Sequence, residues 1–446
     1  MAKPEPYLDP NLPAAPIRHI VRPVTRFLRV ESASGDVLLA CTAVALALAN
    51  SPAAAWWAHL WHTPVAVEVG AFNLAGEIGH FVVNDVLMTV FFFVVGLEIK
   101  RELVAGELRD PRQAALPVVA ALGGMLVPAL IYFALQRGQP GERGWGVPMA
   151  TDIAFVVGVM ALLGKRVPPG LKIMLLTLAI ADDIGAVVVI AVFYSTGVSW
   201  AMIGGAAVGL VAVAALNRLG VRSVEVYAAV GAVVWLAMLK SGVHPTIAGV
   251  TLGLMTPSAA WLSGDALRRS VAVFHLRLED AVAPPDVSEL ESMAFAARES
   301  MPPLERLERY LHPWVGFLIM PLFALANAGV TVDVAAITSS VALAAAVGLF
   351  VGKPAGILLF SWLAVRSGLA RLPAGVTWPV LLGGGFLAGI GFTMSLFVAG
   401  LALHGDLLAA GKVGTLCGSV ASAAVGAAIL AVTLRKPKPG DIGRPA

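Results

Sequence analysis

The chain has 446 residues, of which 58% are hydrophobic and only 13% are charged, with a formal net charge of +3. Soluble domains carry about 25% charged residues, so this composition indicates a protein that lies mostly in a membrane. It excludes most soluble enzymes, nucleic-acid-binding modules and disulfide-bonded scaffolds, because about twelve spans of about 20 residues each leave no room for a large soluble domain.

The first 33 residues predict a cytoplasmic arm rather than a cleaved signal. Four arginines precede the first long apolar run, namely Arg18, Arg22, Arg26 and Arg29. A signal peptide would place its apolar region near the start of the chain. If the arm is helical, the arginines share one face and can meet anionic lipid headgroups. A simple topology signal is the other interpretation.

Twelve apolar segments follow the arm, separated by charged residues or by glycine and proline. They lie at 34–52, 80–98, 114–135, 147–164, 171–194, 200–216, 224–239, 243–257, 312–329, 338–364, 377–403 and 408–434. The segments 147–164 and 243–257 are short and interrupted. We therefore expect an all-α polytopic membrane protein with twelve transmembrane helices over residues 34–434.

Lysine and arginine residues concentrate on alternate connections between these segments. The other connections carry only Arg137, Arg143, Lys240 and Lys412. Positive charge is retained in the cytoplasm, so the pattern predicts an even number of spans with both termini inside. Residues 435–446 then form a basic cytoplasmic tail.

Two connections stand apart from the rest. Residues 53–79 contain the alternating run PVAVEVGAFNLAG, which predicts a short external β-hairpin rather than a helix. Its exposed edges can pair with a second copy, so we expect a homodimer. Residues 258–311 predict a cytoplasmic connection, either a solvated linker or a segment with amphipathic helix.

Five ionisable residues fall well inside the predicted spans: Asp85, Asp152, Asp182, Asp183 and Lys353. An ionised group at this depth costs at least about 2.5–3.5 kcal/mol and is by default a functional candidate. Asp182 and Asp183 lie near the middle of their span and point about 100° apart on a helix. Since Lys353 is the one base at membrane depth, pairing with bases cannot account for both acids.

Asp152 follows Thr151 in a segment that Pro148 weakens, which frees backbone carbonyls as ligands. A carboxylate, a hydroxyl and carbonyls suit a hard cation such as Na⁺ or Li⁺, although Asp152 can instead cap a broken helix. A second interrupted segment contains five glycines, namely Gly383, Gly384, Gly385, Gly389 and Gly391. Paired interrupted segments are typical of a transporter binding site, where Asp152 and Lys353 can offset the partial charges of the half-helix ends.

Several motifs together resemble the bacterial NhaA-type Na⁺/H⁺ antiporters. In chain order they are NDVLMTVFFFVVGLEIKREL, ATDIAF, LAIADDIGA, SGVHPTIAGV, LHPWVGFLIMPLFALANAGV, GKPAGI and GIGFTMSLF. The resemblance implies twelve helices in inverted-topology repeats, of which the fourth and eleventh are unwound and cross at mid-membrane. It places the protein in the bacterial inner membrane.

The resemblance also implies roles for individual residues. Asp183 is the central carboxylate for cation and proton, Asp152 and Thr151 contribute to the crossed-helix site, and Asp182 alternates between carrying a proton and pairing with Lys353. Asp85 supports transport from the second helix. Residues implied in pH regulation are Glu98, Arg101, Glu102, His244, Glu308 and His312, although His312 can simply cap or pack at the start of a helix.

The predicted activity is the exchange of cytoplasmic Na⁺ or Li⁺ for external protons, in sodium and pH homeostasis. Competition between the cation and protons for the same carboxylates couples the two flows, and two protons per Na⁺ would move one net charge per cycle. We expect no cofactor, no nucleic-acid partner and no enzymatic reaction. The alternatives are a passive cation channel and an intramembrane aspartyl protease that uses Asp152 and Asp183.

Overall fold

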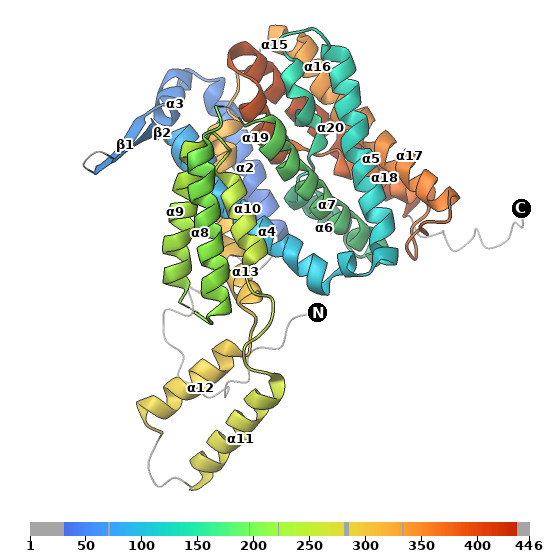
Figure 1. Ribbon diagram of the computed structural model, residues 1–446. Coiled ribbons are helices and arrows are strands. Elements are labelled where there is room, and N and C mark those ends of the chain that lie inside the picture. The colour runs from blue at the N-terminus through green and yellow to red at the C-terminus, as the bar shows by residue number, and fades with distance from the viewer. Residues whose placement is uncertain are drawn as a thin grey trace, which may run out of the picture.

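The computed structural model describes residues 31–69, 72–195, 197–221, 223–280, 285–331 and 334–434. Nine of the helices in these ranges are long and apolar enough to span a membrane, or up to eleven if each of two bent helix pairs is one span. The predicted span at 243–257 is a helix of ten residues, α10. The protein is thus a helical, multi-pass membrane protein (Figure 1), but the predicted count of twelve spans is not reached by this measure.

The first part of the chain is helical except for one hairpin. Its helices are α2 (Glu31–Ala49), α3 (Ala54–Trp61), the π-helix η1 (Ile78–Leu87), α4 (Met88–Ala105), η2 (Glu107–Arg109), α5 (Pro111–Gln136), η3 (Glu142–Met149), α6 (Ile153–Leu163), η4 (Gly164–Arg166), α7 (Pro169–Phe193), α8 (Trp200–Arg218), α9 (Val224–Ser241) and α10 (Thr246–Met255). Proline at the first position starts α5 and α7, where its missing N–H costs nothing. Gly242, in the left-handed conformation at φ 79°, ends α9.

The second part of the chain contains helices and connecting turns, and no strand among its described residues. Its helices are α11 (Gly264–Asp280), α12 (Val287–Glu299), α13 (Pro303–Trp314), η5 (Val315–Ile319), α14 (Met320–Asn327), α15 (Val334–Thr338), α16 (Ser340–Val347), η6 (Gly348–Gly352), α17 (Lys353–Arg366), α18 (Trp378–Ala388), α19 (Phe392–Ala402) and α20 (Gly405–Thr433). The π-helical turns η5 and η6 join α13 to α14 and α16 to α17, so each pair continues as one span.

The hairpin prediction for 53–79 is correct only in its second half. Strands β1 (Pro64–Val69) and β2 (Phe72–Glu77) pair antiparallel, with Pro64 opposite Glu77. The first half of the segment is the helix α3, which turns by 118° from α2. Trp57 is buried and contacts Trp61 edge-on at 5.4 Å, so packing of the tryptophans favours a helix there.

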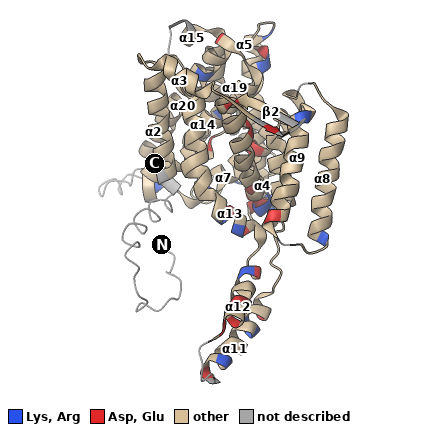
Figure 2. Ribbon diagram, turned by 90° about the vertical axis from the view of Figure 1, so that its left-hand side faces the viewer, with Lys and Arg blue, Asp and Glu red and all other residues tan. Residues whose placement is uncertain are grey.

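The connection at 258–311 contains two amphipathic helices, not a solvated linker. Helices α11 and α12 form a hairpin that projects from the helical body (Figure 1), joined by an ion pair of 2.9 Å between Arg277 and Glu289. The next span begins earlier than predicted, at Pro303 instead of residue 312, because proline at its first position starts α13. Charged residues gather on this hairpin and at the ends of the body, whereas the spans are mostly uncharged (Figure 2).

Glycines bring α5 and α17 into close contact. A side chain on Gly123 would collide with the carbonyl of Gly356, and one on Gly356 with the carbonyl of Gly123. Small residues at helix contacts let backbones approach within the membrane. The close contact between α5 and α17 holds the start of α17, where Lys353 lies, at the centre of the molecule.

Candidate ion-binding site

Two spans are interrupted near their middles, as predicted. Between η3 and α6, residues 150–152 leave the helical conformation, with Ala150 and Asp152 extended. Between α18 and α19, a break at Gly389–Gly391 bends the two helices by 46°. Each break leaves backbone groups without their helical partners, which must find others inside a membrane.

The two breaks are hydrogen-bonded to one another. The backbone N–H of Asp152 donates to the carbonyl of Ile390 at 2.7 Å, and the Thr151 hydroxyl donates to the carbonyl of Ala388 at 2.9 Å. Two backbone carbonyls that the second break leaves without helical donors therefore accept hydrogen bonds from residues of the first break. Segments separated by more than 230 residues are fixed together at this point.

The Asp152 carboxylate lies at the N-termini of two helices. It accepts from the backbone N–H of Phe155 at 3.3 Å, at the start of α6. Its other oxygen accepts from the backbone N–H of Thr393 at 3.1 Å, and from the hydroxyl of Thr393, at the start of α19. Because helix N-termini carry partial positive charge, this carboxylate stabilises both half-helices. The predicted capping interpretation of Asp152 therefore describes its contacts in this structure.

Lys353 lies beside the C-terminus of a helix, whereas Asp152 lies at helix N-termini. It is fully buried at the start of α17 and donates both to the carbonyl of Met149, the last residue of η3, and to the carboxylate of Asp182. A positive charge at a helix C-terminus offsets its partial negative charge. Asp152 and Lys353 thus lie at helix ends whose partial charges are opposite in sign to their own.

Asp182 and Asp183 are neighbours on α7 with different surroundings. Asp182 is fully buried, pairs with Lys353 and lies 2.7 Å from the Thr151 hydroxyl, whose single proton is shared between this carboxylate and the carbonyl of Ala388. Asp183 is 3% exposed, and its Oδ1 has no hydrogen-bond partner among the described residues. The prediction that the two acids face different partners is correct. Oδ1 of Asp182 has no hydrogen-bond partner among the described residues either, so Asp183 differs from Asp182 in forming no ion pair with a described residue.

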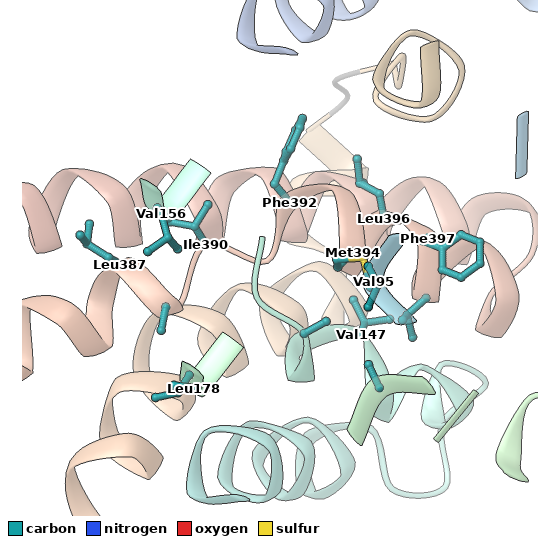
Figure 3. Close-up of a cluster of buried hydrophobic side chains, with 14 of the residues drawn as sticks. Val95, Val147, Val156, Leu178, Leu387, Ile390, Phe392, Met394, Leu396 and Phe397 are labelled. Carbon is teal, nitrogen blue, oxygen red and sulfur yellow. The ribbon is translucent and has the colours of Figure 1, made fainter. Parts of the chain in front are cut away.

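An apolar shell surrounds the junction of the two breaks. Figure 3 shows that Leu387 and Ile390 lie before and at the second break, while Val147 and Val156 lie on either side of the first. Leu178, on α7 one turn before Asp182, also belongs to this buried cluster. Because this shell shields the junction from water, electrostatic interactions between its charged and polar groups are strong.

A cavity of about 750 Å³ lies between the end of α4, η2, the start of α5 and α7. Its charged lining residues are Glu102, Glu107, Arg109 and Asp110. Thr177 also lines the cavity and precedes Asp183 by six residues on α7. The cavity thus lies beside the first half of α7, and none of the buried acids lines it.

The residues expected in pH regulation lie in two places. Arg101 of α4 forms an ion pair with Glu308 of α13, and Glu102 accepts from the backbone N–H of Glu107 at 3.1 Å. Glu98 lies one turn before Arg101 on α4. His312 lies inside α13, not at the start of a helix as expected, because α13 begins at Pro303.

His244 and Asp85 lie together, apart from the other regulatory residues and from the central acids. Asp85 is buried in η1, 3.7 Å from Nε2 of His244 and 3.4 Å from Nδ1 of His80. The structure thus brings together Thr151, Asp182 and Lys353 but does not bring Asp85 to them.

Sequence reasoning missed three residues with defined contacts: Thr393, His80 and Ser419. The Ser419 hydroxyl of α20 accepts from the backbone N–H of Phe392 at 3.1 Å, which caps α19 from another helix. Serine and threonine are common in membrane helices, so nothing local distinguishes these positions. An acid–histidine spacing of five residues signals the His80–Asp85 pair only if the helix there is π-helical.

Buried charges at two interrupted spans of a multi-pass membrane protein are typical of an ion transporter, because ionisable residues at this depth are costly and mark ion pathways. The chain belongs to the Na⁺/H⁺ antiporter 1 family, which it matches over residues 25–430. Three similar proteins are the Na⁺/H⁺ antiporter NhaA 2 of Acidiphilium cryptum, NhaA of Rhodopirellula baltica and NhaA 2 of Sorangium cellulosum. The first is 49% identical to this chain, with 94% of this chain and 94% of its own length aligned. The second is 50% identical, with 96% of this chain and 97% of its own length aligned. The third is 52% identical, with 96% and 94% aligned.

Proposed function

We propose that this chain exchanges cytoplasmic Na⁺ or Li⁺ for external protons across the bacterial inner membrane, in sodium and pH homeostasis. Its relatives are named Na⁺/H⁺ antiporters and match nearly its whole length, so a channel or a protease is not favoured. The observation that carries the proposal is the buried Asp183, whose Oδ1 lacks a partner beside a second acid that pairs with lysine.

Asp183 is the carboxylate that binds either a proton or the cation. Protons and Na⁺ exclude one another from the same oxygens, so arrival of one releases the other. Thr151 and Asp152 border the same junction and contribute further oxygen ligands. In the described residues no three His, Cys, Asp or Glu side chains are arranged to hold a metal ion. We infer that Asp182 must leave Lys353, or Asp152 its donors, before a cation is fully coordinated.

Two protons per Na⁺ are exchanged when Asp183 and the Asp182–Lys353 pair both change protonation. One net charge then crosses per cycle, an energy of about 2.3 kcal/mol per 100 mV of membrane potential. An imposed potential should therefore change the exchange rate in proteoliposomes. A rate independent of potential would contradict this stoichiometry.

The finer architecture is also part of the proposal. It consists of twelve spans over 34–434 in inverted repeats, with the fourth and eleventh unwound and crossing. The bonds between Thr151, Asp152 and the carbonyls at 388 and 390 support the crossing. The arm at 1–33 and the tail at 435–446 would both be cytoplasmic; residues 1–30 and 435–446 lie outside the described residues. The hairpin would then be external and the α11–α12 hairpin cytoplasmic.

Regulation and assembly complete the proposal. The ion pair between Arg101 and Glu308 joins α4 to α13, and the neighbouring Glu102 lines the cavity beside α7, so titration there can change access to the acids. Glu98, Glu102 and His312 belong to the same region, and His244 adds a second one. The outer edges of β1 and β2 have no partner strand in the described residues, which favours a homodimer, and anionic lipids are candidate partners of the basic arm.

The test is Na⁺-driven pH change in inverted membrane vesicles. Asp183→Asn removes the carboxylate with little change of volume and should abolish the signal. Asp406→Asn, the same change at an exposed position on α20, is the matched control and should retain full activity. Activity in the Asp183→Asn variant equal to wild type would overturn the assignment.

A further inference from the structure

A row of alternating histidines and carboxylates leads from the β-hairpin into the helical body. Nδ1 of His62, at the end of α3, lies 2.7 Å from the Glu77 carboxylate, the last residue of β2. His80 follows Glu77 by three residues at the start of η1, and its Nδ1 lies 3.4 Å from Asp85. The other oxygen of Asp85 lies 3.7 Å from Nε2 of His244.

Exposure falls sharply along this row. The side chains of His62, Glu77 and His80 are 69%, 49% and 73% exposed, whereas those of Asp85 and His244 are 7% and 11% exposed. The outer three residues are therefore in contact with water and the inner two are shielded from it. A buried acid with histidines on both sides has no stabilising cation that is permanently charged, so its contacts depend on where protons lie.

The inner end of the row reaches the second broken span. The ring of His244 packs edge-on against Phe397 of α19, with centroids 5.2 Å apart. Phe397 follows Thr393 by one helical turn, and Thr393 donates to Asp152. Nδ1 of His244 lies 2.8 Å from the Thr246 hydroxyl, which leaves Nε2 directed towards Asp85.

We propose that His62, Glu77, His80, Asp85 and His244 form an external proton-entry row that takes protons from the external water to the buried Asp85–His244 pair, which packs against α19. The inference rests on the proposed exchange of external protons and extends it by naming their route. An imidazole accepts a proton on one ring nitrogen and releases one from the other, and a carboxylate accepts and releases on its oxygens, so nothing is consumed.

Ion-pair distances define every step of the row except the one between Glu77 and His80, which are three residues apart in the chain and both exposed, so water joins them. The gaps of 3.4 and 3.7 Å at Asp85 are crossed through one water molecule or a small rotation. Three other titratable residues lie on the elements around the row: His59 on α3, Glu68 on β1 and Lys240 on α9. His59 makes no ion pair among the described residues and is a matched control histidine.

The test uses oriented proteoliposomes with His80→Gln, Glu77→Gln and the control His59→Gln. Two rates are measured over a range of external pH: Na⁺/H⁺ exchange and ²²Na⁺/Na⁺ exchange, which moves no protons. We expect His80→Gln to slow Na⁺/H⁺ exchange by about tenfold or more at alkaline external pH, where protons are scarce, and to shift its external pH profile. Glu77→Gln should act in the same direction, and His59→Gln should match wild type.

The outcomes separate this inference from the proposed function. Loss of Na⁺/H⁺ exchange with retained ²²Na⁺/Na⁺ exchange supports the row. A wild-type pH profile for both His80→Gln and Glu77→Gln overturns it, as does an equal loss of both exchange reactions, since that marks a structural role. If wild-type protein itself performs no Na⁺/H⁺ exchange, the proposed function fails and the row fails with it.

Discussion

The two interrupted spans both leave backbone groups without helical partners, and they provide different kinds of groups to pair with them. The first break supplies the side chains: Thr151 and Asp152 bond to backbone groups of the second break at 2.9 and 3.1 Å. The second break contains glycines and supplies backbone carbonyls and N–H groups. One carboxylate thus serves both helix N-termini, and Asp183, which forms no ion pair with a described residue, lies on a third, unbroken helix. We infer that Asp152 holds the breaks and adds a ligand, whereas the exchange of a proton for the cation is the task of Asp183.

The largest effect is expected at Lys353, which joins η3 to Asp182. Lys353→Met leaves a fully buried carboxylate without its cation and should lower the free energy of unfolding by about 3–5 kcal/mol. Adding Asp182→Asn removes the unpaired charge and should recover most of that loss. Chemical denaturation in detergent measures both. A single variant as stable as wild type would show that this pair does not hold the first break.

A smaller effect is expected at the second break, where α20 caps α19. Ser419→Ala leaves the backbone N–H of Phe392 without an acceptor and should cost about 1 kcal/mol of stability, and Ser419→Thr should restore it. Ser422, one turn later, is fully buried and its hydroxyl has no partner among the described residues. Ser422→Ala is therefore the matched control, and equal losses for both serines would argue against the cap.

The smallest effect is expected at Asp286, whose carboxylate caps the N-terminus of α12 at a solvent-exposed position. Its carboxylate accepts from the Ser288 hydroxyl and from the backbone N–H of Glu289, and these bonds lower its pKa. The stabilisation of α12 is present above the unfolded pKa of Asp286 and lost as pH falls through the lowered folded value. The hydrogen-exchange protection factors at the start of α12, corrected for the intrinsic rate at each pH, should therefore fall in acid, and Asp286→Ala should remove this dependence.

The sequence predicted the parts of the site that carry charge. Asp152, Asp182, Asp183 and Lys353 are recognisable because an ionisable residue in an apolar run is costly, and glycine and proline mark both breaks. The bonds to Thr393 and Ser419 could not be predicted, because they join residues more than 200 and 25 positions apart and involve side chains that need no special environment.

The errors in the fold have local causes. The helix α3 was missed because the alternating residues of the hairpin dominate the segment 53–79, although the tryptophans lie at helical spacing. The start of α13 was placed at residue 312 because Glu305, Glu308 and Arg309 lower the apolar content of its first turns. The structure pairs one of these, Glu308, with Arg101, which sequence periodicity cannot show.

The central claim is that Asp183 exchanges a proton for Na⁺ while Asp152 holds the broken helices. The most direct test is calorimetric titration of Na⁺ into purified protein, in buffers of different ionisation enthalpy, which gives the protons released per ion bound. We predict proton release for wild type and for Asp152→Asn protein that remains folded, and none for Asp183→Asn. Unchanged proton release in Asp183→Asn would contradict the claim.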